Sequence, residues 1–151
     1  VKNKVVIVTG AGSGIGKATA IHFAKHGAKV VVSDINLESA QKVVDEIVTN
    51  FGEALPIKAN VAVFKEVENL VQHTVANFGK LDVIVNNAAI GCDVGAEIPS
   101  TELARRTLTC NTINTIYFTH HSVLYVTSKA ILVQKYDNSY YITDCIQVYL
   151  L

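Results

Sequence analysis

Four short apolar runs, each followed by a helix-like pattern or a turn, constrain the fold of this chain most strongly. The runs cover residues 4–10, 29–34, 54–60 and 81–88, and the third is weaker than the others. Each run is continuous rather than alternating, which is typical of strands that are buried on both faces. Helices that connect such strands make right-handed crossovers. The pattern therefore predicts an α/β fold: a doubly wound parallel sheet with flanking helices.

Three helices are expected between these strands, and the sequence marks their ends. The first carries an apolar stripe that begins at Ile15, and Gly27 closes it. Asn36 is a candidate N-cap for the second helix, which should end at Gly52. The third has apolar residues at helical spacing within residues 63–79.

A glycine-rich segment, "TGAGSGIG" at residues 9–16, joins the first strand to the first helix. Glycine allows positive φ angles and lets a ligand approach the backbone closely. The free N–H groups and the positive dipole end of the following helix suit a pyrophosphate. A plain tight turn is the alternative interpretation of this segment. Its spacing is GxxxGxG, with glycines at positions 10, 14 and 16. It does not fit the strict GxGxxG pattern, because the last glycine of that pattern would fall at Ile15 or at Lys17.

Asp34 ends the second strand, 18 residues after Gly16. A carboxylate at that position can accept hydrogen bonds from a ribose diol and would repel a 2′-phosphate. We therefore expect NAD(H) as the cofactor rather than NADP(H). A capping or solvated aspartate is the structural alternative.

These motifs resemble those of the short-chain dehydrogenase/reductase family. "TGAGSGIG" matches its TGxxxGxG motif, "NNAAI" at residues 86–90 resembles its NNAG segment, and "YVTSK" at 125–129 resembles its YxxSK motif. The resemblance covers residues 1 to about 119 and resumes at 125. It implies a Rossmann fold and an NAD(P)-dependent oxidoreductase acting on secondary alcohols or ketones, with a 3-oxoacyl compound or a small alcohol as substrate.

The resemblance also implies a set of site residues. The residues expected to line the cofactor are Gly10, Ser13, Gly14, Ile15, Gly16, Asp34, Asn60, Val61, Asn87, Ala88 and Lys129. Those expected to act in catalysis are Tyr125, Lys129 and Asn111, the last as support for a proton-relay water. Ala89 replaces the family's usual glycine. For Asn86 and Asn87, the alternative is a strand-end turn in which the side chains bond nearby backbone.

The Tyr125–Lys129 spacing has a chemical reason of its own. Residues four apart share a helix face, so the ammonium of Lys129 can lie near the hydroxyl of Tyr125. A nearby cation favours the phenolate and makes tyrosine a better base. Tyr125 could then exchange a proton with the reacting oxygen while hydride moves to or from nicotinamide. A solvated helix face is the alternative.

The segment between Asn111 and Tyr125 is too short for the family's pattern. It holds residues 112–124, which would have to finish a helix, form a strand of about 5 residues and turn twice. The family's catalytic serine ends such a strand, and Ser122 is only a poor substitute for it. We therefore expect a single domain, incomplete at its C-terminal side: a cofactor-binding half at 1–119, a remnant of the catalytic helix at 120–135 and an atypical tail at 136–151.

Two expectations concern this C-terminal part. The sequence at 122–136 can form a helix, whereas residues 139–151 are rich in aromatic and β-branched residues and should be extended. Without its usual neighbour, the fourth strand would have an open edge. The tail could cover such an edge in the same molecule or pair with another chain. A frayed tail without a partner is the alternative. At the level of function, the alternative to an active oxidoreductase is a catalytically impaired NAD-binding fragment or interaction module.

Composition excludes several functional classes. Lysine plus arginine equals aspartate plus glutamate at 13 each, so no net field favours nucleic acid or an anionic membrane. No apolar run is long enough to span a bilayer, and the first strand begins too early to leave room for a signal peptide. We therefore expect a cytoplasmic protein, and the family resemblance adds a small-molecule substrate and, for a folded chain, a homo-oligomer.

Metal and disulfide sites are not expected. The cysteines, Cys92, Cys110 and Cys145, are odd in number, form no CxxC pair and fit free thiols in a reducing compartment. His22 and His26 could share one helix face, but no cysteine or acidic residue with ligand spacing accompanies them.

Overall fold

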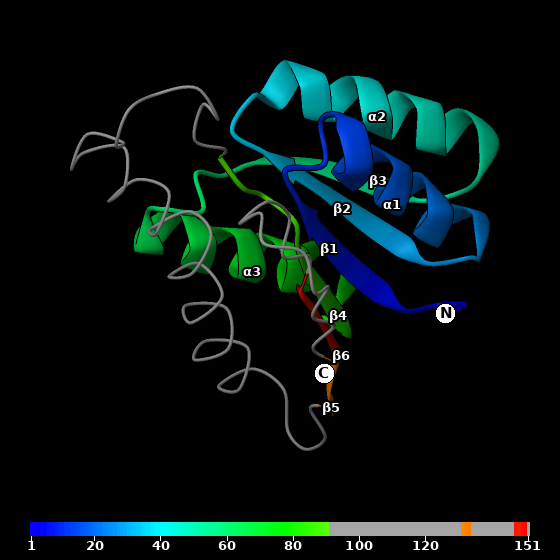
Figure 1. Ribbon diagram of the computed structural model, residues 1–151. Coiled ribbons are helices and arrows are strands. Elements are labelled where there is room, and N and C mark those ends of the chain that lie inside the picture. The colour runs from blue at the N-terminus through cyan, green and yellow to red at the C-terminus, as the bar shows by residue number, and fades with distance from the viewer. Residues whose placement is uncertain (91–130, 134–146, 151) are drawn as a thin grey trace, which may run out of the picture.

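The computed structural model describes residues 1–90, 131–133 and 147–150 (Figure 1). Within these residues, strands and helices alternate from the N-terminus. The elements are β1 (Val5–Thr9), α1 (Gly14–Lys25), β2 (Lys29–Asp34), α2 (Leu37–Asn50), β3 (Ala54–Lys58), α3 (Phe64–Phe78), β4 (Val83–Asn86), β5 (Ile131–Val133) and β6 (Gln147–Leu150).

The sheet has the strand order β3-β2-β1-β4-β6-β5. The first four of these strands are parallel, with β1 between β2 and β4 and with β3 beside β2. The helices lie on both faces: α1 and α2 cover one, and α3 covers the other (Figure 1). The predicted doubly wound parallel sheet with flanking helices, a Rossmann fold, is confirmed for this part of the chain.

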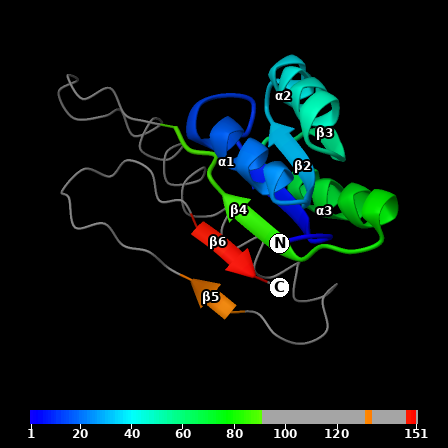
Figure 2. The same ribbon diagram turned by 90° about the vertical axis from the view of Figure 1, so that its right-hand side faces the viewer.

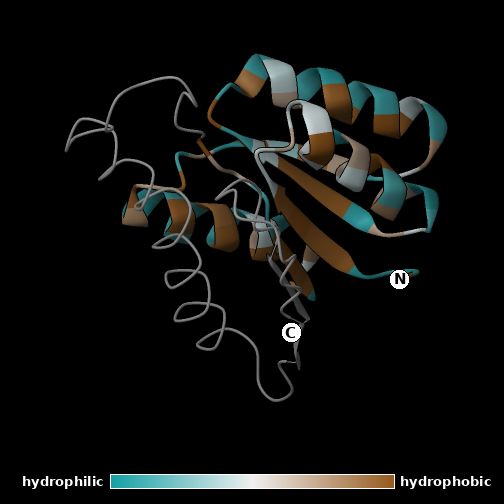
Figure 3. Ribbon diagram, in the orientation of Figure 1, coloured by the Kyte–Doolittle hydropathy of each residue, from teal (hydrophilic) through white to brown (hydrophobic). Residues whose placement is uncertain are grey.

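Burial on both faces explains why the strands read as continuous apolar runs. In β1, Val6 and Val8 pack under α1 and α2, whereas Val5 and Ile7 pack against the core beneath α3. All four side chains are almost completely buried. The hydropathy pattern in Figure 3 agrees, because the strands are brown and the outer helix faces are largely teal. Each such side chain contributes roughly 1.5–3 kcal/mol relative to an exposed position.

The predicted helix ends are close to the observed ones. The side chain of Asn36 caps α2 by accepting a hydrogen bond from the backbone N–H of Ser39 at 3.2 Å. Gly27 has a φ of 80° just after α1, and Gly79 has a φ of 78° at the end of α3. Both angles lie in the left-handed region that favours glycine after a helix.

The sheet continues beyond β4 with antiparallel strands. β6 lies beside β4, with Val83 opposite Leu150 and Asn86 opposite Gln147, and β5 lies outside β6 (Figure 2). The prediction that the tail is extended is confirmed for Gln147–Leu150, and of the two alternatives these residues cover the edge of β4 within the same chain. Residues 139–146 and 151 lie outside the described residues.

The predicted helix over 122–136 is wrong at residues 131–133. These residues form β5, which pairs with β6. Ile131 and Val133 are β-branched and favour a strand when a neighbour supplies backbone partners, as β6 does. The remainder of that segment lies outside the described residues.

None of the helices in the described ranges is long and apolar enough to cross a lipid bilayer.

Candidate functional site

The loop between β1 and α1 folds back against the end of β4. Gly10 has a φ of 62°, a conformation that favours glycine. Gly16 has a second reason to be glycine, because a Cβ there would lie 2.3 Å from the carbonyl oxygen of Gly10 and 2.5 Å from Nδ2 of Asn87. The first turn of α1 is thus pressed against the loop and leaves no space for a side chain at Gly16.

The N-terminus of α1 is open to an anion. Ser13 is the N-cap residue, but its side chain makes no capping hydrogen bond, and the first turn contains no acidic residue. The first N–H groups of a helix have no partner within the helix and carry a partial positive charge. This end of α1 can therefore bind a negatively charged group.

Two backbone N–H groups fix the carboxylate of Asp34 at the end of β2. Oδ2 accepts a hydrogen bond from the N–H of Gly12 at 2.9 Å, and Oδ1 accepts one from the N–H of Asn36 at 3.0 Å. A Cβ at Gly12 would lie 2.8 Å from Cβ of Ser39 and 2.9 Å from Oδ2 of Asp34. The glycine therefore lets the loop approach the carboxylate closely. Each carboxylate oxygen can accept a further hydrogen bond, so Asp34 can still bind a ligand.

Thr9 and Asn87 lock the end of β4 to the glycine loop. The Thr9 hydroxyl accepts hydrogen bonds from the backbone N–H groups of Asn87 and Ala88, both at 3.1 Å, and donates to the carbonyl of Val85. Nδ2 of Asn87 donates to the carbonyls of Thr9 at 2.9 Å and Gly10 at 3.2 Å. The side chain of Asn87 therefore bonds backbone that is distant in sequence and not the backbone of its own turn.

Asn86 behaves differently from Asn87. Its side chain is buried at the end of β4, and neither its Nδ2 nor its Oδ1 has a hydrogen-bond partner among the described residues. The same holds for the buried hydroxyl of Ser33 at the end of β2. Neither residue lines the cleft described below.

The end of β3 continues into a turn that Asn60 and Glu66 hold. Oδ1 of Asn60 accepts a hydrogen bond from the N–H of Ala62 at 3.0 Å, and the N–H of Asn60 donates to Glu66 at 2.7 Å. These two bonds use the Oδ1 and the backbone N–H of Asn60. The Nδ2 of its side chain can therefore donate to other partners.

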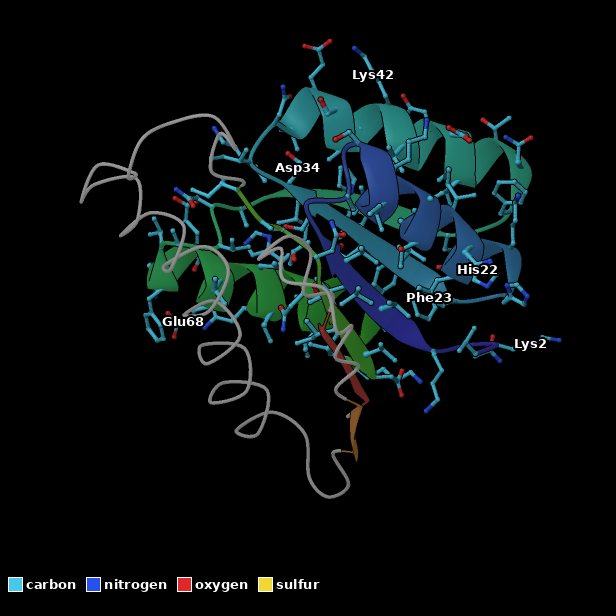
Figure 4. All side chains as sticks on the ribbon, viewed as in Figure 1. Lys2, His22, Phe23, Asp34, Lys42 and Glu68 are labelled. Atoms are coloured by element: carbon cyan, nitrogen blue, oxygen red, sulfur yellow. The ribbon has the colours of Figure 1, made fainter. Side chains whose placement is uncertain are left out.

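A cleft of ≈ 500 Å³ lies across the carboxyl ends of the four parallel strands. Ten of the eleven residues predicted to bind the cofactor line it: Gly10, Ser13, Gly14, Ile15, Gly16, Asp34, Asn60, Val61, Asn87 and Ala88. Figure 4 shows Asp34 where β2 passes into α2. The eleventh, Lys129, and the predicted catalytic residues Tyr125 and Asn111 lie outside the described residues. In open α/β sheets, ligands bind at this edge.

Four lining residues were missed by sequence reasoning: Ile35, Ala59, Ala89 and Ile90. Ile35, Ala59 and Ala89 each directly precede or follow a predicted site residue, and Ile90 comes two residues after Ala88. That adjacency was the available signal, because every residue leaving the carboxyl end of a parallel strand passes the same edge.

Comparison with known proteins gives the family. The model of the family described as short chain dehydrogenase matches residues 4–133. This protein belongs to the short chain dehydrogenase family. Members of the family are oxidoreductases that bind NAD(P).

Individual short chain dehydrogenases resemble this one over about half of their own length. A cyclohexanol dehydrogenase from Acinetobacter is 48% identical over 120 residues, which cover 79% of this chain and 47% of the relative. The 7alpha-hydroxysteroid dehydrogenase of Escherichia coli is 42% identical over 102 residues, or 68% of this chain and 40% of the relative.

A solved short chain dehydrogenase structure also matches. The 3-ketoacyl-(acyl-carrier-protein) reductase from Brucella melitensis, complexed with NADH, superposes with a TM-score of 0.76 at 35% identity. The match covers 82% of this chain and 50% of that one.

Proposed function

We propose that the cleft binds NAD(H), and that the chain supplies the cofactor-binding part of an oxidoreductase that transfers hydride between NAD(H) and a secondary alcohol or ketone. One observation carries the proposal. A carboxylate fixed by two backbone N–H groups, that of Asp34, lies in a cleft next to an uncapped helix N-terminus. This arrangement offers an acceptor for a diol beside a donor set for an anion.

The order of the polar groups suits a dinucleotide. The α1 N-terminus follows β1, an inner strand, and would hold the pyrophosphate. Asp34 at the end of β2 would accept hydrogen bonds from the ribose diol, and Asn60 and Val61 at the end of β3 would flank the adenine. On the other side, Asn87 and Ala88 follow β4 and would flank the nicotinamide ribose. Three strand spacings of about 4.8 Å separate β3 from β4, roughly 14 Å, which suits an elongated ligand.

Asp34 is also the basis for proposing NAD(H) over NADP(H). A 2′-phosphate on the ribose would lie next to a carboxylate whose two oxygens are held in place. The Gly12 and Asn36 N–H groups restrain that carboxylate, so it cannot readily turn away. Repulsion between the phosphate and the adjacent carboxylate would weaken the binding of NADP(H). The solved relative in complex with NADH agrees with the proposal.

The proposed chemistry needs three residues that lie outside the described part. A bound NAD would supply the acceptor for the hydride of the carbinol carbon. Tyr125 would take the proton from the alcohol oxygen, and in the reverse direction would return it to the alkoxide oxygen. Lys129 would favour the phenolate of Tyr125 and contact the ribose, and Asn111 would hold a relay water. A secondary alcohol or its ketone is proposed as substrate because the cyclohexanol and hydroxysteroid dehydrogenases are among the relatives.

A second candidate function is an NAD-binding module without turnover. The arrangement at β4 favours it, because the neighbouring strand there is the antiparallel β6 from the C-terminal tail. A strand from the tail occupies the edge where a further parallel strand would extend the catalytic half. Binding of NADH without oxidation or reduction of any alcohol or ketone would distinguish this candidate from an active enzyme.

The remaining expectations are proposals of the same kind. The chain would form a single domain with its cofactor-binding half at 1–119, associate as a homo-oligomer and work in the cytoplasm, where its three cysteines would stay reduced.

An NADH titration of the full chain, followed by cofactor fluorescence, tests the proposed function. We expect NADH to bind saturably with 1:1 stoichiometry. ATP should displace NADH, since the two nucleotides would occupy the same cleft. An unchanged NADH signal up to millimolar protein would contradict both candidate functions.

A further inference from the structure

The C-terminal turn of α1 carries two histidines on one exposed face, away from the cleft. His22 lies in the last turn of α1, and His26 is the C-cap residue (Figure 4 labels His22). Their ring centroids are 4.4 Å apart and their planes are tilted by 45°. Both side chains are exposed, so solvent and ions reach them directly.

A backbone hydrogen bond orients one of the two rings. Nδ1 of His26 lies 2.8 Å from the carbonyl oxygen of His22. A carbonyl oxygen only accepts hydrogen bonds, so Nδ1 carries the proton and donates it. The lone pair of the neutral ring is then on Nε2, which is free to bind an ion. A ring nitrogen that donates to a backbone carbonyl while the other binds metal is the usual arrangement of histidine ligands.

Lys25 lies between the two histidines in the sequence, but its charge does not prevent a cation from binding to them. Lys25, the nearest lysine along the chain, places its Nζ 5.1 Å from the centre of the Phe51 ring and so directs its charge toward the end of α2. The C-terminus of α1 itself carries the partial negative charge of the helix.

We propose that His22 and His26 form a two-histidine site for a divalent transition-metal ion that prefers imidazole, in the order Cu²⁺ before Ni²⁺ and Zn²⁺. An ion held about 2.0–2.1 Å from each nitrogen needs the two nitrogens roughly 3 Å apart. Ring centres 4.4 Å apart bring the two side chains close enough for side-chain rotation to place one nitrogen of each at that separation. Water would complete the coordination, because the described residues contain no group of three histidine, cysteine or acidic side chains that could hold a metal.

The sequence alone predicts no metal site here, because no cysteine or acidic residue with ligand spacing accompanies the two histidines. Two ligands on adjacent turns suffice for moderate affinity, because binding the first makes the second intramolecular. The bound ion would bridge the last turn of α1 and stabilise it where the chain turns at Gly27 toward β2.

Two measurements locate the site. In amide NMR spectra, trace Cu²⁺ should selectively broaden the signals of residues 22–28 in the parent protein. His22→Gln and His26→Gln should each abolish that broadening. His73→Gln removes an exposed histidine from α3 and is the matched control; it should leave the broadening unchanged.

Ni²⁺ calorimetry supplies the affinity. All proteins in this series carry His120→Gln and His121→Gln, since these residues lie outside the described part. We expect His22→Gln and His26→Gln each to weaken Ni²⁺ binding at least tenfold, with unchanged circular dichroism. The proposal fails if broadening at residues 22–28 persists in either variant, if His73→Gln weakens binding equally, or if the parent shows no selective broadening.

Discussion

The carboxylate of Asp34 accepts a hydrogen bond from the backbone N–H of Gly12 at 2.9 Å, although the two residues are 22 positions apart. The bond joins the end of β2 to the loop that precedes α1. It places a fixed negative charge beside the N-terminus of a helix. The contact between Gly12 and Asp34 would therefore favour NAD(H) over NADP(H), which carries one phosphate more.

The first prediction concerns that selection. NADH should bind at least tenfold more tightly than NADPH, a difference of about 1.4 kcal/mol. Asp34→Ala should reduce this preference, because it removes the charge beside the 2′ position. Fluorescence titration with both cofactors measures it. Glu38→Ala, which removes an exposed carboxylate from the first turn of α2, is the control and should preserve the preference. Equal affinities in the parent protein would refute the role of Asp34.

A second prediction concerns the close approach at Gly16. Gly16→Ala should abolish NADH binding and lower the free energy of unfolding by roughly 1–3 kcal/mol, since its Cβ would overlap the carbonyl of Gly10. The control is Gly79→Ala at the end of α3, where φ is 78° but no atom lies near the added Cβ. It should reduce stability by about 1–2 kcal/mol and leave binding intact. Urea unfolding and NADH titration of both variants make the comparison, and equal binding by the two would argue against a packed loop.

A third prediction separates catalysis from binding. Tyr125→Phe should abolish turnover of any alcohol or ketone substrate found for the parent, while NADH affinity changes by less than about twofold, because the hydroxyl acts only on the reacting oxygen. Steady-state rates and cofactor titration provide the two measurements. A variant that keeps the parent's rate would show that the tyrosine takes no part in the chemistry.

A fourth prediction concerns pH and Asp82, which precedes β4. Partial burial raises the pKa of Asp82, but hydrogen bonds from Lys80, the Val5 N–H and Lys4 outweigh it, so the pKa lies below its usual value. A depressed folded-state pKa stabilises the protein at pH values above the unfolded pKa of about 3.9, and this stabilisation is lost as pH falls through the folded pKa.

Asp82→Asn should therefore lower the free energy of unfolding at pH 7 by roughly 1.5–3 kcal/mol. It should also flatten the decline of stability below pH about 4. Urea unfolding from pH 7 to pH 3 measures both effects. Asp45→Asn, on the exposed face of α2, is the control and should reproduce the parent's pH dependence. The assignment is wrong if the two variants have the same pH profile.

The last prediction concerns the β4 edge. β6 pairs with β4 along its whole length, from Val83 to Asn86. Removing residues 139–151 should expose the backbone groups of an apolar strand and cause self-association. Size-exclusion chromatography over a range of concentrations measures it, with removal of Leu151 alone as the control. A soluble monomer of unchanged thermal stability would show that the tail is dispensable.

The sequence by itself determined the parallel half of the fold and most of the cleft. Continuous apolar runs such as that of β1 predict strands buried on both faces, and the glycine at position 10 is explained by its positive φ angle. Because parallel strands all end at one edge, the residues after them could be assigned to a common site without coordinates. Asn36 as a helix cap is likewise a local property.

Only the tertiary structure decided which distant groups meet. The bond from Gly12 to Asp34, the hydrogen bonds from Asn87 to the glycine loop and the ion pair of Lys4 with Asp82 join residues that no local pattern relates. The strand at Ile131–Val133 is the clearest case. Its residues fit a helix or a strand, and pairing with β6 decides between them, because strand preference depends on the neighbour that satisfies the backbone.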